Sequence, residues 1–428
     1  MRARLAFGVS VVAAIAVACE LAFPTHLVGD GCPSTCAGPN TLASCVDAQT
    51  PCALGCTADP ALGARCLDLD PSGVADPSSY TNATADTVWN GDADAAADSG
   101  AETIVLDTGS GAITRGTTTI RAAGTGLDGP SGITFTLADQ LDDSRVSSTT
   151  SPGLGIFGFH SLTIGKGVIV VVEGQRAAAL ASDTDMTIDG LVSAACSGST
   201  PGPGGFAPDD GPCHGGPQTT WQCGTDQKTG QPIHCTSAGG GAGYATAGGA
   251  GDVQDGTHAG AGGPAFPPLD GGPFVLFGGS GGGSGNGAGG GALQLAASRS
   301  FALGGSVSAC GCAGHSGSSG FGGGRGGGGA GGMIVIESPS VQIGATAIIA
   351  ANGGSGGSVD GVLGAQPANG GAGAGQGGAL LGNATSGSNG GGGGSAGRVV
   401  IDSLPGAATI ADGGIVSPAP AVGGVTGK

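Results

Sequence analysis

Short runs of β-branched and aliphatic residues dominate the chain from about residue 101. Thr103–Leu106, Ile133–Leu137 and Ser161–Ile164 are examples, and Gly, Asp, Ser and Pro stand between such runs. Runs of this length and composition are typical of β-strands joined by turns. We therefore expect an all-β region built from short strands.

The strand pattern repeats in the second half of the chain. Each copy has a strand, a tight turn, a second strand, a glycine, a third strand and a small residue, followed by a glycine-rich stretch. Copies begin at Ala292–Leu295, Met333–Ile336 and Arg398–Ile401, and Ile188–Cys196 matches the second half of the unit. Units that cannot bury an apolar face alone stack and share a core. The repeat predicts a parallel β-solenoid (β-helix) over 101–428, with glycine-rich loop excursions.

The longest glycine tracts cover residues 236–291, 313–332 and 353–397. Glycine loses much backbone entropy when it becomes ordered and has no side chain to bury. We expect these tracts to be flexible excursions on one face of the solenoid. The alternative is extended polyglycine helices that pack together and resemble those of some phage tail-tip adhesins.

Composition narrows the choice of partners. Glycine accounts for 97 of 428 residues, charged residues for 10%, and the formal net charge is −18. This much glycine without a strict three-residue period excludes collagen and indicates repeats. Nucleic-acid phosphates require clusters of Lys and Arg, which the chain lacks. Nucleic acid is therefore excluded as a partner.

The first residues are typical of an export signal. Arg2 and Arg4 give a positive start, and Leu5–Ala18 form a largely apolar run that is too short for a permanent membrane span. We expect a signal peptide over residues 1–18. The protein is then exported to the cell envelope.

The end of this segment carries a candidate lipidation site. Ala16-Val17-Ala18-Cys19 resembles the lipobox of bacterial lipoproteins, in which the cysteine is acylated and becomes the new N-terminus. That family prefers Leu at the place of Ala16. We expect lipidation of Cys19 and a lipid-anchored tether over residues 19–31. An ordinary signal peptide cut nearby is the alternative.

Thirteen cysteines are an odd number for an oxidising compartment. Assigning Cys19 to the lipid leaves twelve, which fall into even groups. We expect these twelve to form disulfides. The candidates are Cys32, Cys36, Cys45, Cys52, Cys56, Cys66, Cys196, Cys213, Cys223, Cys235, Cys310 and Cys312.

Six of these cysteines lie within residues 32–66, with the spacing C-x3-C-x8-C-x6-C-x3-C-x9-C. A segment this short with few bulky apolar side chains needs disulfides in place of a core. It has no histidine, so we expect a disulfide module and not a zinc site. Residues 67–100, rich in Pro, Ser, Asp and Ala, are expected to be a linker or cap.

The repeat alignment places Cys196 and Cys310 at equivalent positions. Stacked layers bring such positions together, so a bridge between these two cysteines is one expected pairing. Other pairings of Cys310 remain open, with Cys312, Cys213, Cys223 or Cys235. His214 and His234 adjoin two of these cysteines, but the spacing matches no standard zinc finger. We therefore expect disulfides there and no metal site.

Polysaccharide lyases and hydrolases often use the β-helix fold, so carboxylates need attention. Glu337 and Asp402 occupy equivalent repeat positions and are expected to share a column. Asp139, Asp142 and Asp143 cluster after a strand. Polar residues at strand ends and in solvated turns are the favoured interpretation, because fold analogy alone supplies no catalytic site. We expect no catalytic residue and no cofactor.

The chain as a whole resembles a group of glycine-rich surface lipoproteins of certain Gram-negative soil bacteria. The resemblance rests on Cys19, on the segment Arg65–Ser72, on Thr187–Gly190 and on blocks such as Gly289–Leu293. The group implies no assigned activity. We expect a non-catalytic envelope lipoprotein with a structural or adhesive role. It would be bound to the membrane through its lipid, with an extracellular glycan or another surface protein as partner. A polysaccharide-active enzyme and a calcium- or glycan-binding envelope module are the alternatives.

Overall fold

The chain divides into two compact units, Met1–Leu67 and Asp68–Lys428. The computed structural model describes residues 35–38, 41–43, 49–52, 55–59, 63–67, 69–70, 83–91, 101–140, 152–217, 220–225, 229–251, 260–266, 275–284, 287–314, 325–357 and 391–427. Both units are built from strands, and the second contains extended parallel sheets. The all-β prediction is confirmed for this part of the chain.

The first unit consists of two small antiparallel groups of strands. One is a three-stranded sheet, and the other is a hairpin that pairs Cys56 with Cys66. A disulfide joins Cys36 to Cys56 across the two groups. The strands are β1 (Thr35–Gly38), β2 (Thr41–Ala43), β3 (Gln49–Pro51), β4 (Cys56–Asp59) and β5 (Gly63–Cys66).

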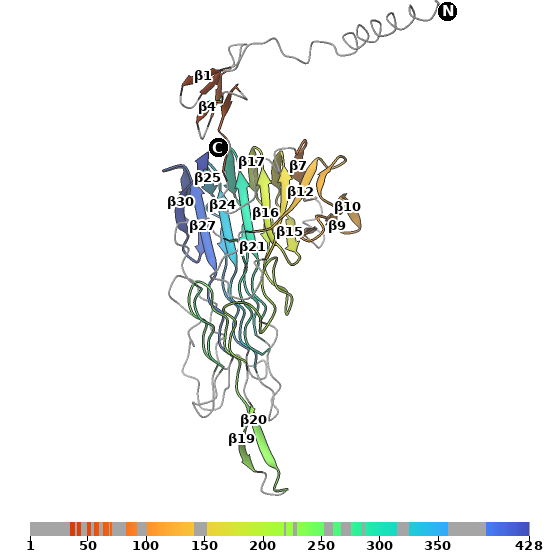
Figure 1. Ribbon diagram of the computed structural model, residues 1–428, viewed down its shortest axis with the longest axis vertical. Coiled ribbons are helices and arrows are strands. Elements are labelled where there is room, and N and C mark those ends of the chain that lie inside the picture. Colours follow the sequence, from red (N-terminus) through yellow and green to blue (C-terminus); the bar gives the residue numbers. More distant parts are fainter. Residues whose placement is uncertain are drawn as a thin grey trace, which may run out of the picture. The chain divides into compact units, whose positions relative to one another are not determined.

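Three larger sheets form the second unit (Figure 1). Sheet A contains, in spatial order, β11 (Gly126–Asp128), β12 (Ile133–Ala138), β13 (Leu154–Phe159), β16 (Ala177–Ser182), β21 (Ala292–Ala297), β24 (Met333–Glu337), β27 (Arg398–Ser403) and β30 (Ala421–Gly424). Sheet B contains β28 (Ala408–Ile410), β25 (Val341–Ile343), β22 (Ser300–Leu303), β17 (Asp185–Ile188), β14 (Ser161–Ile164) and β7 (Asp86–Trp89). Sheet C contains β10 (Thr118–Arg121), β9 (Ile113–Arg115), β8 (Glu102–Asp107), β15 (Val168–Glu173), β18 (Leu191–Ser193), β23 (Ser306–Ser308), β26 (Ile348–Ala350) and β29 (Ile415–Ser417).

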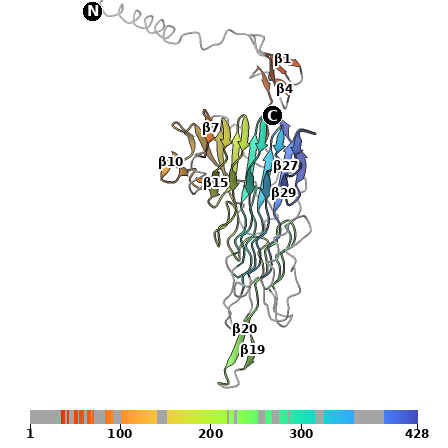
Figure 2. The ribbon, with the colours of Figure 1, turned by 180° about the vertical axis from the view of Figure 1, so that it is seen from behind.

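The chain visits these sheets in a fixed order. From β13 onward it passes from sheet A to sheet B to sheet C and then returns to sheet A, one strand along. Each strand therefore pairs in parallel with its counterpart in the next layer, as β16 does with β21 and β21 with β24. Figure 2 shows the same succession from behind. The described residues contain five such three-strand layers, which begin at β13, β16, β21, β24 and β27.

Equivalent positions in successive layers form apolar columns inside the three sheets. Sheet A contributes Phe157, Leu180, Leu295, Ile336 and Ile401. Sheet B contributes Ile164, Ile188, Leu303 and Ile343. Sheet C contributes Val170, Val192, Val307 and Ile349. All are buried in one cluster. Each such side chain stabilises the fold by about 1.5–3 kcal/mol, which explains why a short apolar strand recurs in each layer.

Antiparallel strands seal the first end of the stack. β9 and β10 extend sheet C, and β11 and β12 extend sheet A. Arg121, the last residue of β10, is buried, and its guanidinium lies 5.4 Å from the centre of the Phe135 ring. Its guanidinium donates hydrogen bonds to five backbone carbonyls, those of Gly111, Ala122, Gly124, Gly126 and Ile133. These bonds satisfy the buried guanidinium and tie the capping strands together.

The glycine-rich excursions all leave at the same corner, between a strand of sheet C and the next strand of sheet A. They follow β18, β23 and β26. Figures 1 and 2 show them running side by side beyond the strands. The first excursion also contains an antiparallel hairpin, β19 (Thr220–Thr225) with β20 (Pro232–Thr236). At the end of the chain, β31 (Thr426–Gly427) pairs with β6 (Leu69–Asp70).

Backbone hydrogen bonds order the described parts of these excursions. The segment Gly327–Gly332 donates backbone hydrogen bonds to three neighbouring segments in turn. Amides that are three residues apart donate to the same neighbour. The donor–acceptor pairs are Gly327–Gly283 and Ala330–Ser280, Gly328–Gly392 and Gly331–Ser395, and Gly329–Cys312 and Gly332–Ala309. Three residues per turn is the repeat of polyproline II. The expectation of flexible excursions is therefore wrong for the described residues, which pack as extended polyglycine segments.

Close packing explains why these segments need glycine. A Cβ atom added to Gly332 would lie under 3.0 Å from the backbone of Gly291, and one added to Gly289 would lie as close to Gly279. Real Cβ atoms do not approach backbone this closely. The segments lose entropy on ordering, but their amides gain hydrogen-bond partners inside a buried array. Sequence reasoning counted the entropic cost and missed this compensation.

Candidate functional site

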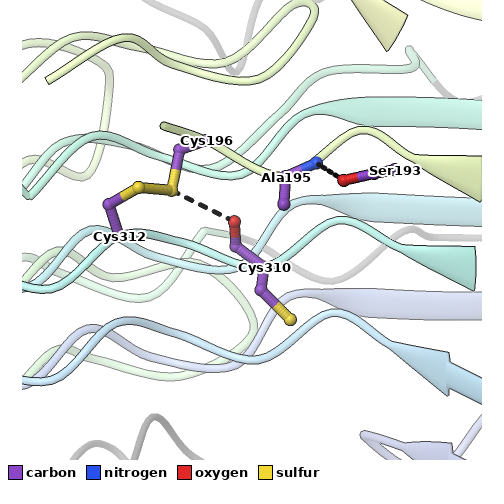
Figure 3. Close-up of a disulfide and its surroundings, with 5 residues drawn as sticks. All are labelled: Ser193, Ala195, Cys196, Cys310 and Cys312. Carbon is purple, nitrogen blue, oxygen red and sulfur yellow. Dashed lines mark hydrogen bonds between the residues drawn. A yellow bond between two sulfur atoms is a disulfide. The ribbon is translucent and has the colours of Figure 1, made fainter. Parts of the chain in front are cut away.

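The corner where the excursions leave contains a cluster of three cysteines (Figure 3). The amide of Cys196 donates to the carbonyl of Cys310 at 3.2 Å, so these residues are neighbours in adjacent layers. They are not at equivalent positions, as the repeat alignment predicted them to be, because the register of Ser193 with Ser308 places Cys310 level with Ala195. The disulfide, however, joins Cys196 to Cys312, with an S–S distance of 2.05 Å. The Cys310 side chain points away from this bond in Figure 3, and its Sγ lies 3.5 Å from the Ala350 carbonyl.

Two of the predicted disulfide cysteines carry free thiols instead. These are Cys310, which is partly exposed, and Cys213, which is buried. Cys213 packs in an apolar cluster with Tyr244 and the neighbouring strands of sheet A. Burial raises the pKa of its thiol to about 11, although Arg398 lowers it in part. A protonated, enclosed thiol is a weak nucleophile, so Cys213 serves as an apolar side chain.

The remaining predicted cysteines are distributed between the units. In the first unit, Cys36 is bonded to Cys56 and Cys52 is also disulfide-bonded. Only the backbone is described for Cys66 in β5, Cys223 in β19 and Cys235 in β20. The predicted lipidation site Cys19 and the disulfide candidates Cys32 and Cys45 lie outside the described residues.

No group of three or more His, Cys, Asp and Glu side chains within the described residues could hold a metal ion. His214, beside Cys213, places its Nδ1 3.1 Å from the Gly215 carbonyl. The side chain of His234 lies outside the described residues. Nor does this set contain a helix of the length and apolarity that a membrane span requires.

The carboxylate column predicted from the repeat is present. Glu337 of β24 and Asp402 of β27 are in register in sheet A, which confirms their equivalence. Both are buried, at 2% and 8% exposure. Glu337 accepts a hydrogen bond from the side-chain amide of Gln294 in β21. The site is therefore a line of polar groups crossing three layers on the outer face of sheet A.

Asp402 terminates this line. Burial raises the pKa of its carboxyl group, and a hydrogen bond from the backbone of Gly423 lowers it in part. A raised pKa is common at catalytic carboxylates, but a general acid must also reach its substrate. These two carboxylates have little exposed surface. Asp139 is exposed, follows β12 and is distant in sequence from Glu337 and Asp402. Asp142 and Asp143 are outside the described residues.

An aromatic cover over sheet A was missed at the sequence level. Tyr244, Phe266 and Phe277, all from the first excursion, pack on one another and on the outer face of the sheet. The Tyr244 hydroxyl donates to the Phe277 carbonyl at 2.9 Å. Arg398 of β27 lies 5.4 Å from the Tyr244 ring centre and donates to the Phe266 carbonyl.

The signal for this cover was the position of the aromatics. Aromatic residues make up only 4% of the chain, yet several stand inside a tract that is rich in glycine and alanine. A bulky side chain in such a tract has to be buried against something. Because strands of sheet A are buried on both faces, as β16 and β21 are, a second layer outside them was to be expected.

Comparison with protein-family models, with curated proteins and with solved structures finds no match to this chain.

Proposed function

We propose that this chain is an exported, non-catalytic protein of the bacterial cell envelope, anchored by a lipid on Cys19. Its second unit acts as a parallel β-solenoid that carries the glycine segments as a rigid array. The role is structural or adhesive, with the array and its connecting loops presented to a glycan or to another surface protein. The export signal and the lipobox-like segment Ala16–Cys19 support the location.

One observation carries the proposal, namely the ordered glycine array. Its segments bond to neighbours in three directions, and most of their described residues, such as 325–332, are buried. Loops that emerge from a rigid scaffold bind at a lower entropic cost than loops on a mobile one. An array of this kind is well suited to holding contact loops at a fixed spacing.

The winding of the chain supports the solenoid. Successive strands pass through sheets A, B and C in a constant order and pair in parallel from layer to layer. Each layer buries its apolar side chains only against its neighbours, as in repeat proteins whose units stack in one dimension.

The polysaccharide-active enzyme is the second candidate, and it rests on one feature. Glu337 and Asp402 are adjacent carboxylates on neighbouring strands, and burial raises the pKa of Asp402. Two carboxyl groups at short separation are the machinery of glycoside hydrolysis. Their burial and their bonds to Gln294 and Gly423 favour a role in joining layers.

The anchor is tested by labelling. The full chain is produced in a Gram-negative host supplied with labelled palmitate, beside the variants Cys19→Ser and Cys310→Ser. We expect the label in the wild type and in Cys310→Ser, both in the membrane fraction, and no label in Cys19→Ser. Equal labelling of Cys19→Ser, or absence of label from all three, would contradict the anchor.

The role is tested on envelope and soil polysaccharides, with and without calcium, scored for retention and for new reducing or unsaturated ends. Retention without new ends supports adhesion, and the absence of both supports a structural role. New ends that disappear in Glu337→Gln and in Asp402→Asn would replace the proposal with the second candidate. Retention only with calcium would indicate a calcium-dependent glycan module.

A further inference from the structure

No described strand pairs with the outer side of the last layer of the second unit. Strand β28 ends sheet B, β29 ends sheet C and β30 ends sheet A, and none of the described strands pairs beyond them. Three rows of backbone donors and acceptors are thus left at one end of the stack. Such edges readily pair with a further strand.

The apolar interior is also open at this end. Val422 continues the column of Ile401 in register, yet it is 66% exposed where Ile401 is 1% exposed. Ile410 continues the column of Ile343 and is 44% exposed, against 2% for Ile343. The apolar columns are therefore buried up to the layer before the last and exposed to solvent in the last one. Exposed apolar groups that lie together, beside open strand edges, mark an interaction surface.

The opposite end is capped over two of its three sheets. There the antiparallel strands β9 to β12 continue sheets A and C, and Ile113 of β9 and Phe135 of β12 are fully buried, while sheet B ends at β7. The open end of one molecule cannot therefore pair with all three sheets at the capped end of another without displacing this cap. Growth into a head-to-tail fibre is therefore disfavoured. The remaining symmetric arrangement is a dimer in which the two open ends pair with each other.

We propose that the open end binds the open end of a second copy of this chain. Viewed from outside, the open ends of the two copies wind in the same direction. When they face each other one copy is turned over, so each edge strand runs antiparallel to the edge strand that it meets. If the two-fold axis passes through one sheet, that sheet pairs with the same sheet of the second copy, and the other two sheets pair with each other. The edge strands are of similar length, three residues in β28 and β29 and four in β30, which suits this exchange.

Charge also favours a second copy. The chain carries a net charge of −18, which opposes association of most of its surfaces. Within residues 403–427 the only charged side chain is Asp412. The strand β6, which pairs with β31, adds Asp70 opposite Thr426. Two such ends therefore bring together few charged residues beside the exposed Val422 and Ile410. The contact removes water from the exposed apolar side chains of both ends, and it brings few like charges together.

The test is the mass of the full chain in solution, by sedimentation equilibrium over a range of concentrations. The variant Val422→Lys places a charge at the open end, on a side chain that is already exposed. The control Val88→Lys changes a side chain that is 53% exposed on β7, at the first end. We expect the wild type and Val88→Lys to approach twice the mass of one chain, and Val422→Lys to dissociate at least about tenfold more readily.

A wild type that stays at the mass of one chain, or equal weakening by both variants, would overturn the proposal. Masses that grow without limit would show head-to-tail assembly and also overturn it. Hydrogen exchange gives an independent reading, because amides of β28 to β30 should be protected more as concentration rises. Full protection at the mass of one chain would mean that the chain covers its own end.

Discussion

At the scale of single residues, the glycine array depends on positions where a methyl group has no room. Gly332 donates to the Ala309 carbonyl, and a Cβ on it would meet the backbone of Gly291. That backbone is held by bonds of its own and cannot move aside cheaply. We therefore expect Gly332→Ala to lower the free energy of unfolding by about 1–3 kcal/mol, measured by urea denaturation.

Gly129 supplies the matched control for this change. It has no atom within 4 Å of an added Cβ and no positive φ. Gly129→Ala should leave the stability unchanged or raise it slightly, because alanine restricts the unfolded chain. If both variants unfold at the same urea concentration, the close packing of the array is not what requires glycine there.

The buried carboxyl group of Asp402 makes a prediction about pH. Burial raises its pKa above the ordinary value of 3.8, against a smaller opposing effect of the Gly423 hydrogen bond. Between the two pKa values the folded state binds more protons than the unfolded state. Stability is therefore lost as pH rises through that window, and the loss is complete above the folded pKa. Asp402→Asn, which removes the charge, should be more stable than the wild type at pH 7.

This advantage should shrink as the pH falls toward 3, because the wild-type carboxyl group is then also neutral. Thermal unfolding of the wild type and Asp402→Asn at several pH values measures it. The exposed Asp412 provides the control Asp412→Asn, for which no comparable gain is expected. A gain that is independent of pH, or equal in both variants, would contradict burial of the charge as the cause.

At the scale of elements, the disulfide between Cys196 and Cys312 ties the start of the first excursion to the start of the second. It closes a loop with a sequence separation of 116 residues. A loop of this length loses much conformational freedom in the unfolded chain when it is cross-linked. We expect the double variant Cys196→Ser, Cys312→Ser to lose about 2–4 kcal/mol of stability in denaturant. Cys310→Ser, which keeps the bond, should lose little, and an equal loss in both would contradict this account.

Several elements could be predicted from sequence because their side chains carry the pattern. The alignment of Ile336 with Ile401 and of Glu337 with Asp402 follows from repeated strands, and the structure has both registers. The pairing of Cys196 was harder. The repeat alignment correctly brought Cys310 and Cys196 into contact, but it was off by one residue, because the register of Ser193 with Ser308 places Ala195 level with Cys310. It also does not fix side-chain direction at a corner, where the bond goes instead to Cys312.

The glycine segments could not be predicted in the same way, because glycine has no side chain to show a period. Their order comes from hydrogen bonds between segments far apart in the chain, such as Gly328 with Gly392. Only the aromatics within the tract gave a sign. Tyr244 and Phe266 indicate that this excursion lies against a surface, and the free thiol of Cys213 is buried with them. A buried thiol needs no disulfide partner.

At the scale of the whole molecule, the two units rest on different stabilising interactions. Cys52 is the only apolar side chain described as buried in Met1–Leu67, whereas the second unit has a long apolar core through its layers. A unit without a core depends on its disulfides. The second unit has one disulfide among its described residues and should keep its fold without it.

Calorimetry of the full chain, with and without a reductant, therefore has a defined expectation. Two transitions should appear under oxidising conditions, and the reductant should abolish the smaller one. The larger transition should survive at a lower temperature, because the bond between Cys196 and Cys312 is lost. In the variant Cys196→Ser, Cys312→Ser the larger transition should already be at that lower temperature, and the reductant should not move it further. A reductant that abolished both transitions would show that disulfides, and not the stacked apolar columns, hold the second unit together.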